Sequence, residues 1–170
     1  RGVPFNTGDG LRMALDIGAM PHGSWTTCHA SPQDINMPPF TVPSMHAYKD
    51  SMNRYMYPYG IMVNVNGERF VDEASDTRGR TYASMGRAIL DQPGGIAFQI
   101  MGGNFRKMNL YPVTYNSATT AKADTLEQLA EQLDINAENL VRTVQAFNAA
   151  IQPGQFDPNR YKLDGKGTKG

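Results

Sequence analysis

The segment Gly60-Ile-Met-Val-Asn-Val-Asn-Gly-Glu-Arg-Phe-Val-Asp-Glu73 contains two short apolar runs that are separated by Asn66-Gly67. Aliphatic β-branched and aromatic residues are enriched in strands, and Asn-Gly readily adopts the positive φ angles of a two-residue hairpin turn. The pattern therefore predicts a β-hairpin with arms at 60–65 and 68–72. The other predicted elements are arranged around this hairpin.

A helix and a strand are predicted after the hairpin. Residues 80–90 carry apolar or small side chains on one helical face, namely Tyr82, Met85, Gly86, Ile89 and Leu90. Gln92-Pro93-Gly94-Gly95 ends this helix because proline and glycine interrupt helical backbone. Residues 96–101 then have the pattern of a strand, so the predicted order is hairpin, helix, strand.

Two further helices are predicted near the end of the chain. Thr125-Leu-Glu-Gln128 is a capping box, and an apolar stripe follows it at Leu126, Leu129, Ala130 and Leu133. After a short linker, a second stripe consists of Leu140, Val144, Phe147 and Ile151. Residues 152–170 carry almost nothing to bury and are predicted to be a linker.

The first part of the chain is predicted to be a helix followed by a long loop. Thr7-Gly8-Asp9-Gly10 is a helix start, with Asp9 as its capping residue, and the helix is expected to end near Gly18. Prolines interrupt every periodic pattern between residues 20 and 58. Loops of this length inside compact proteins are usually functional.

Composition excludes some classes of function. Sixteen basic and sixteen acidic residues cancel, so the basic surface of a nucleic-acid binder is not expected. No apolar run approaches the ~20 residues of a membrane-spanning helix. A single cysteine, Cys28, excludes an internal disulfide and favours a cytoplasmic location, and no Cys/His cluster has the spacing of a zinc site.

Taken together, residues 6–19, 60–73 and 124–150 resemble the fumarate reductase and succinate dehydrogenase flavoprotein superfamily (FAD-dependent oxidoreductase 2). The resemblance covers nearly the whole chain. Within the superfamily, Ala19-Met-Pro-His-Gly-Ser-Trp25, Cys28-His-Ala30 and Arg80-Thr-Tyr-Ala83 are most similar to FAD-dependent tricarballylate dehydrogenase.

This resemblance implies an α+β capping domain, in which the β-hairpin is packed by several helices. Residues 1–58 would continue an FAD-binding domain into a loop region, 59–151 would form the capping or substrate domain, and 152–170 would lead back to the FAD domain. The family's strand, glycine-rich turn and helix that hold the FAD pyrophosphate are not found here. The chain is therefore expected to be a fragment that is inactive alone and that needs the rest of its own FAD domain.

The resemblance also assigns candidate residues. Asp9, with Thr7 and Gly8, would contact the FAD. His29 would hydrogen-bond a substrate carboxylate, although a lone histidine is more often structural, and His22 and His46 are alternatives by composition. No metal ligands are implied.

Arg78 matches the family's proton-transferring arginine, displaced by one residue, so Arg80 is a rival for that role. Arginine holds its proton so tightly that it is a poor general base, whereas its planar fork is suited to binding a carboxylate. Glu73 or Asp76 could tune the arginine and relay the proton, and Glu73, Arg78, Arg80 and His29 are the candidate substrate ligands. A surface arginine in a charged loop is the structural alternative.

The family's Thr-Glu and Arg before the hairpin are replaced by Asn53-Arg-Tyr-Met-Tyr57, which argues against the fumarate reductase direction. The expected function is hydride transfer between the flavin and a small di- or tricarboxylate, in the manner of tricarballylate dehydrogenation, with a possible electron-transfer partner. Two alternatives are an enzyme like fumarate reductase or ketosteroid dehydrogenase, and a non-catalytic module that binds carboxylates or a partner subunit.

Overall fold

The computed structural model describes residues 4–37, 53–103, 105 and 119–151. In chain order, the described elements are α1 (Asp9–Asp16), η2 (Tyr57–Tyr59), β1 (Ile61–Val63), α3 (Arg78–Leu90), η3 (Pro93–Gly95), β2 (Phe98–Ile100), α4 (Leu126–Leu133) and α5 (Ala137–Ala150). These four α-helices and the two-stranded sheet confirm the predicted α+β class. The predicted linker at 152–170, and His46, lie outside the described residues.

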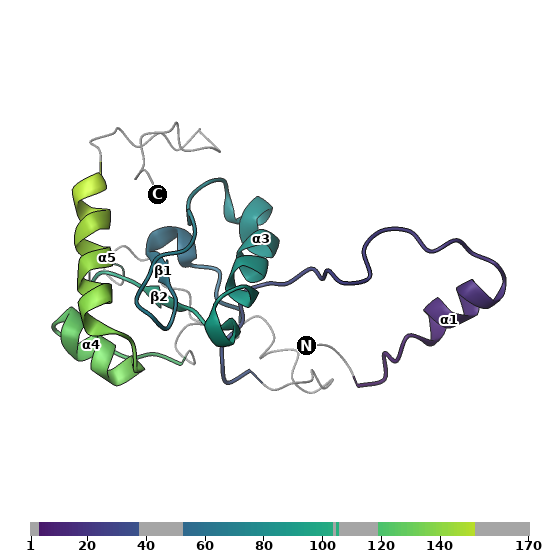
Figure 1. Ribbon diagram of the computed structural model, residues 1–170, viewed down its shortest axis with the longest axis horizontal. Helices are drawn as coiled ribbons and strands as arrows, with labels where there is room; N and C mark the ends of the chain where they lie inside the picture. Colours follow the sequence, from purple (N-terminus) through teal and green to yellow (C-terminus); the bar gives the residue numbers. More distant parts are fainter. Residues whose placement is uncertain (1–3, 38–52, 104, 106–118, 152–170) are drawn as a thin grey trace.

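Strand β1 lies between α3 on one side and the α4–α5 pair on the other (Figure 1). Successive side chains of a strand point to opposite faces. Ile61 and Val63 accordingly pack with Leu140 of α5, whereas Met62 packs with Met85 of α3. All three strand residues are buried, and among the described residues an apolar cluster packs on each face of β1.

The predicted hairpin is wrong in its pairing. Strand β1 pairs antiparallel with β2, with Met62 opposite Gln99, while the predicted second arm contributes only an isolated bridge between Val63 and Arg69. The backbone N–H of Met62 donates instead to the Glu73 carboxylate at 2.6 Å. A side chain therefore satisfies the donor that an ideal hairpin would pair with backbone.

The tight turn itself is present, although its form differs from the prediction. Asn64 O accepts from Gly67 N at 3.0 Å, and Asn64 N donates to Glu68 O at 3.0 Å. Only Gly67, with φ 75°, has the positive φ that was predicted for both Asn66 and Gly67. A turn closed by a glycine in the left-handed region is the usual alternative to the two-residue loop.

Helix α3 begins at Arg78, two residues before the predicted start, with Thr77 as its N-cap. Its first turn is held by Tyr57, whose hydroxyl shares a 2.8 Å hydrogen bond with the Thr81 hydroxyl. Met85 and Gly86 are buried as predicted, whereas Leu90, predicted on the same face, is exposed. The earlier start matters for the site because Arg78 is a helical residue.

Helices α4 and α5 confirm the two predicted apolar stripes. The Thr125 hydroxyl accepts from Gln128 N at 3.2 Å, which is the predicted cap of α4. Leu140 is fully buried, but α5 ends at Ala150 and Ile151 is exposed rather than part of the stripe. No helix in the described residues has the length and apolar character that a membrane crossing requires.

Helix α1 is also confirmed and lies at the end of an extended segment, apart from the other elements (Figure 1). It ends just before Gly18, which has φ 87°. None of its residues is buried in the described part of the chain, and its apolar residues Leu11, Met13 and Leu15 are exposed.

Candidate functional site

Arg78, the sharpest candidate in the sequence, is exposed at the first residue of α3. Its guanidinium carbon lies 5.4 Å from the centroid of the Tyr55 ring. At this distance, the cation is attracted by the electron-rich face of the ring. Tyr55 therefore restricts the position of the guanidinium but does not neutralise its charge.

Tyr82 lies one helical turn after Arg78 and contacts two other rings. Its centroid is 5.8 Å from that of Tyr55, with an edge-on geometry, and 5.0 Å from that of His29. Edge-on and tilted ring pairs are favourable because the positive edge of one ring meets the negative face of the other. Two tyrosines thus bring together the predicted residues His29 and Arg78, which are far apart in the sequence. We call these four residues, His29, Tyr55, Arg78 and Tyr82, the aromatic cluster.

The rival arginine, Arg80, has a different environment. Its side chain is 73% exposed, and its guanidinium pairs with Asp76 at 3.5 Å on the preceding turn. The hydrogen bond and ion pair that Arg80 makes among the described residues are with Asp76 and not with the aromatic cluster. Asp76, which was expected to tune Arg78, is therefore an ion-pair partner of Arg80.

Glu73, a candidate substrate ligand, is only 3% exposed. Its carboxylate accepts from the guanidinium of Arg69 at 2.6 and 3.0 Å and from Met62 N at 2.6 Å. These donors occupy both oxygens and tie the second arm to β1. This environment is that of a structural carboxylate, because a buried charge needs such partners.

The candidate cofactor residues lie around the first turn of α1. The N-cap is Gly8, with φ 83°, so the expectation that Asp9 caps the helix is wrong. The Asp9 carboxylate instead accepts from the Thr7 hydroxyl at 2.6 Å and from Arg12 at 3.1 Å. All three predicted residues, Thr7, Gly8 and Asp9, are exposed. The spacing Gly-x-Gly-x-x-Gly does occur at 165–170, which is outside the described residues.

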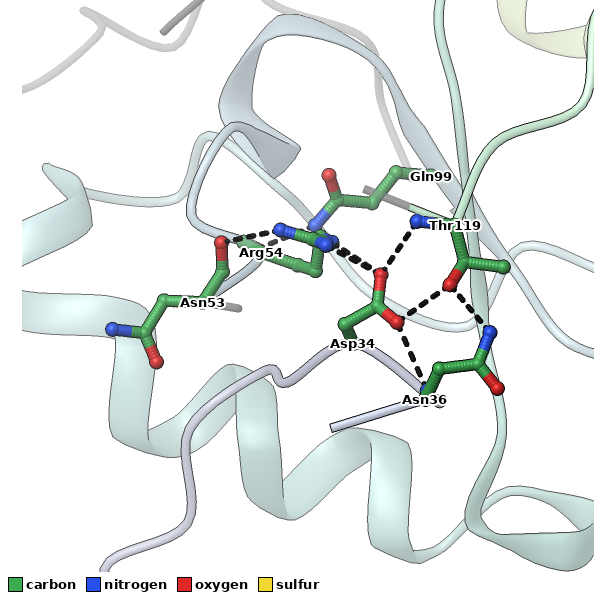
Figure 2. A network of polar contacts seen from close by, with 6 residues as sticks. All are labelled: Asp34, Asn36, Asn53, Arg54, Gln99 and Thr119. Carbon is green, nitrogen blue, oxygen red and sulfur yellow. Dashed lines mark hydrogen bonds and ion pairs between the residues drawn. The ribbon is translucent and has the colours of Figure 1, made fainter. Parts of the chain in front are cut away.

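A buried ion pair that the sequence did not predict holds the His29 segment to the rest of the structure. Asp34 pairs with Arg54, and its carboxylate also accepts from the backbone and hydroxyl of Thr119 at 2.9 and 2.6 Å (Figure 2). Asn36 N donates to the same carboxylate at 2.9 Å. The contacts join three segments that are remote in sequence.

The acidity of Asp34 reflects these contacts. Burial by itself would raise the pKa of the Asp34 carboxyl. Hydrogen bonds from Thr119, Arg54 and Asn36 lower the pKa by more than burial raises it, so the net pKa is about 2. Asp34 is therefore ionised at neutral pH and acts as a fixed anion. Among the described residues, no three His, Cys, Asp or Glu side chains form a group that could hold a metal ion.

The chain is similar in sequence to known oxidoreductases. No model of a protein family matches the chain. It is 28% identical over 176 residues to 4-oxocyclohexanecarboxylate 2-dehydrogenase from Sinomonas cyclohexanicum, covering 94% of this chain and 28% of that protein. It is 29% identical over 155 residues to probable fumarate reductase Ifc3 from Shewanella frigidimarina, covering 88% of this chain and 23% of that protein. Its homologues are oxidoreductases of the fumarate reductase superfamily.

Solved structures of the fumarate reductase superfamily support the same relationship. The chain matches 3-ketosteroid delta1-dehydrogenase from Sterolibacterium denitrificans with a TM-score of 0.58 and 26% identity, over 87% of this chain and 27% of that one. It matches a flavocytochrome c3 fumarate reductase with a TM-score of 0.53 and 26% identity, over 95% of this chain and 27% of that one. The chain thus spans about a quarter of these relatives. They support the superfamily and its flavoprotein character without singling out the tricarballylate branch.

Proposed function

We propose that this chain is the substrate-capping part of an FAD-dependent oxidoreductase. The enzyme would transfer hydride between flavin and one carbon of a carbon–carbon bond next to a carboxylate, while a proton is exchanged at the other carbon. The observation that carries this proposal is the aromatic cluster, in which two tyrosine contacts connect Arg78 with His29. Both residues match candidate ligand positions of the family that the sequence resembles. Both are exposed in this structure and so are accessible to a ligand.

In the proposed site, Arg78 binds the substrate carboxylate. Its planar guanidinium can donate two parallel hydrogen bonds to a carboxylate, and its place against Tyr55 reduces the freedom that binding must remove. His29 donates a further hydrogen bond to an oxygen of the substrate. Hydrogen bonds to charged groups contribute about 1.5 to 3 kcal/mol each, so two such contacts can orient a small acid.

The first turn of α1 is the proposed flavin contact of this chain. The Asp9 carboxylate is exposed and has acceptor capacity beyond Thr7 and Arg12, which fits a hydroxyl-bearing part of a dinucleotide better than a phosphate. Bound flavin would supply the hydride chemistry. The residues of this chain would orient the carboxylate, stabilise charge beside it and exclude water from it.

The substrate class has two candidates. A tricarballylate-like acid matches the resemblance in the sequence, and its several carboxylates suit a site with more than one cation. The second candidate is a substrate that carries its carboxylate on a ring, because the rings of Tyr55 and Tyr82 beside Arg78 could pack against such a substrate. The relatives named for 4-oxocyclohexanecarboxylate and a 3-ketosteroid also act on ring compounds.

The proposal is tested with the flavin-loaded whole enzyme of which this chain is proposed to be a part. The enzyme is offered tricarballylate, 4-oxocyclohexanecarboxylate and its uncharged methyl ester, and flavin reduction is followed without oxygen. Bleaching by one of the free acids but not by the ester supports a carboxylate substrate. His29→Ala should then raise KM by about 10-fold or more through the loss of a charged hydrogen bond. Bleaching by the ester as fast as by the acid, or a whole enzyme that holds no flavin, would contradict the proposal.

A further inference from the structure

Three residues of α3 that contribute to the site are spaced four apart. Arg78, Tyr82 and Gly86 are successive members of one row along the helix, each about 6 Å further along its axis. Arg78 contacts the Tyr55 ring, Tyr82 contacts the rings of Tyr55 and His29, and Gly86 faces the backbone that follows His29.

The contact at Gly86 has no room for a side chain. A Cβ atom at this position would lie 2.4 Å from Ala30 C, 2.5 Å from Ala30 O and 2.6 Å from Ser31 N. These are backbone atoms, so a change of rotamer cannot relieve the clash. Gly86 is buried, and the residues that would be displaced follow directly after His29.

The same segment is held from its other side. Arg54 N donates to Pro32 O at 3.0 Å, and Gln33 forms an isolated β-bridge with Asn53. The Gln33 side chain also donates to the Asn53 side chain at 2.6 Å. The segment therefore lies between α3 and residues 53–54, and an added methyl group at Gly86 must shift the segment or the helix.

We propose that Gly86 is a positioning residue for the site, because its missing side chain lets the segment after His29 lie against α3 and so places the imidazole beside Tyr82. The relevance of this inference to catalysis rests on the proposed function, but the position of the His29 ring beside Tyr82 can be measured separately. Glycine inside a helix is ordinarily replaced by alanine with a gain in stability. At Gly86, replacement by alanine should instead lower the stability.

Gly79 provides a matched control in the same helix. Nothing lies within 4 Å of a Cβ built at Gly79, and its φ is not positive. Gly79→Ala should therefore leave Tm unchanged or raise it by about 2 to 4 °C, the usual scale for removing an exposed helical glycine in a domain of this size. Gly86→Ala should lower Tm.

The deciding measurement is the NMR signal of the His29 ring in protein labelled only at histidine, of which the chain has three. His29→Gln assigns the signal, and Tyr82→Leu measures how far the Tyr82 ring shifts it. In Gly86→Ala, we expect that Tyr82-dependent shift to be lost, and in Gly79→Ala to be kept. A Gly86→Ala protein that folds and keeps the shift would overturn the inference.

A second variant covers the case in which Gly86→Ala does not fold. Gln33→Ala removes the side-chain link to Asn53, which is one of the contacts on the side of the segment away from α3, and so weakens the attachment there. If Gly86→Ala does not fold, Gly86→Ala/Gln33→Ala should regain a folded state with a measurable Tm, and a double variant that also fails to fold would overturn the inference. If the His29 shift is lost while KM for a carboxylate is unchanged, the positioning inference stands and the proposed role of His29 in binding fails.

Discussion

The guanidinium carbon of Arg78 lies 5.4 Å from the centroid of the Tyr55 ring. Arg78 begins α3, whereas Tyr55 precedes η2, and the two elements meet where the Tyr57 hydroxyl bonds Thr81. A cation held on a ring face keeps its full charge and its hydrogen-bond donors. The relationship is therefore suited to presenting an arginine to an acidic ligand.

Tyr55 allows this arrangement to be tested by a conservative pair of variants. Tyr55→Leu should raise KM for the carboxylate by about 2- to 5-fold, because an exposed cation–π contact contributes on the order of 0.5 to 1 kcal/mol. Tyr55→Phe keeps the ring face and should stay close to the wild type. Steady-state kinetics with matched flavin content checks both, and equal effects of Leu and Phe would assign the role to the hydroxyl instead.

Asp34 should be a major contributor to stability. Asp34→Asn removes the anion that pairs with Arg54 and accepts from Thr119, and we expect a loss of about 3 kcal/mol in the free energy of unfolding, as for other broken buried ion pairs. Urea titration measures this loss. Glu131→Gln, the same chemical change at an exposed position of α4, is the control and should stay within about 0.5 kcal/mol of the wild type. A loss for Asp34→Asn no larger than for the control would contradict the account of the network.

The pH dependence of stability should reflect the same residue. The pKa of Asp34 is about 2 in the folded protein, against an ordinary value of 3.8. Because the folded carboxylate binds its proton less tightly than the unfolded one, its stabilisation is complete above the unfolded pKa. It is lost as the pH falls towards 2.

This shift corresponds to about 2 kcal/mol of stability lost between pH 5 and pH 2, on the scale of 1.36 kcal/mol per pH unit. The difference between the urea midpoints of Asp34→Asn and the wild type should therefore be smaller at pH 2 than at pH 5. A constant difference between the two proteins across this range would show that ionisation of Asp34 is not the cause.

Glu73 separates a structural role from a substrate-binding role. Glu73→Gln should cost about 3 kcal/mol in unfolding, because it leaves Arg69 beside a neutral amide in a buried place. The KM of the protein that remains folded should not change. Glu68→Gln, at an exposed position five residues earlier in the chain, is the matched control for stability. A large increase in KM without loss of stability would restore Glu73 as a substrate ligand.

Much of the fold was predictable because local patterns determine it. The capping box at Thr125, the stripe that buries Leu140, and the end of α1 before Gly18 all follow from residues within one or two helical turns. The strand at Phe98–Ile100 was also predicted, but not its partner. Strand pairing depends on residues distant in sequence, so the Asn-Gly turn suggested the wrong neighbour for β1.

The site was only partly predictable for the same reason. His29, Arg78 and Arg80 were selected by resemblance, and the structure distinguishes Arg78 from Arg80 by its neighbours. The tyrosines between His29 and Arg78 were missed because nothing local indicates that Tyr55 and Tyr82 meet. The one available signal was the four-residue spacing of Tyr82 and Gly86 within the predicted helix at 80–90, and Arg78 lay four residues before Tyr82 but outside that predicted helix.

Arg78 and Arg80 offer the most direct test of the central claim. Flavin in the flavin-loaded whole enzyme is first reduced without oxygen, and the return of its absorbance is followed after an unsaturated carboxylate is added, either the unsaturated acid that tricarballylate dehydrogenation forms or cyclohexenecarboxylate. Arg78→Ala should slow this return by about 100-fold or more, the scale seen when one charge-stabilising group is removed, with flavin still bound. Arg80→Ala should react at nearly the wild-type rate. Equal rates in Arg78→Ala and the wild type, or a selective loss in Arg80→Ala, would contradict the account.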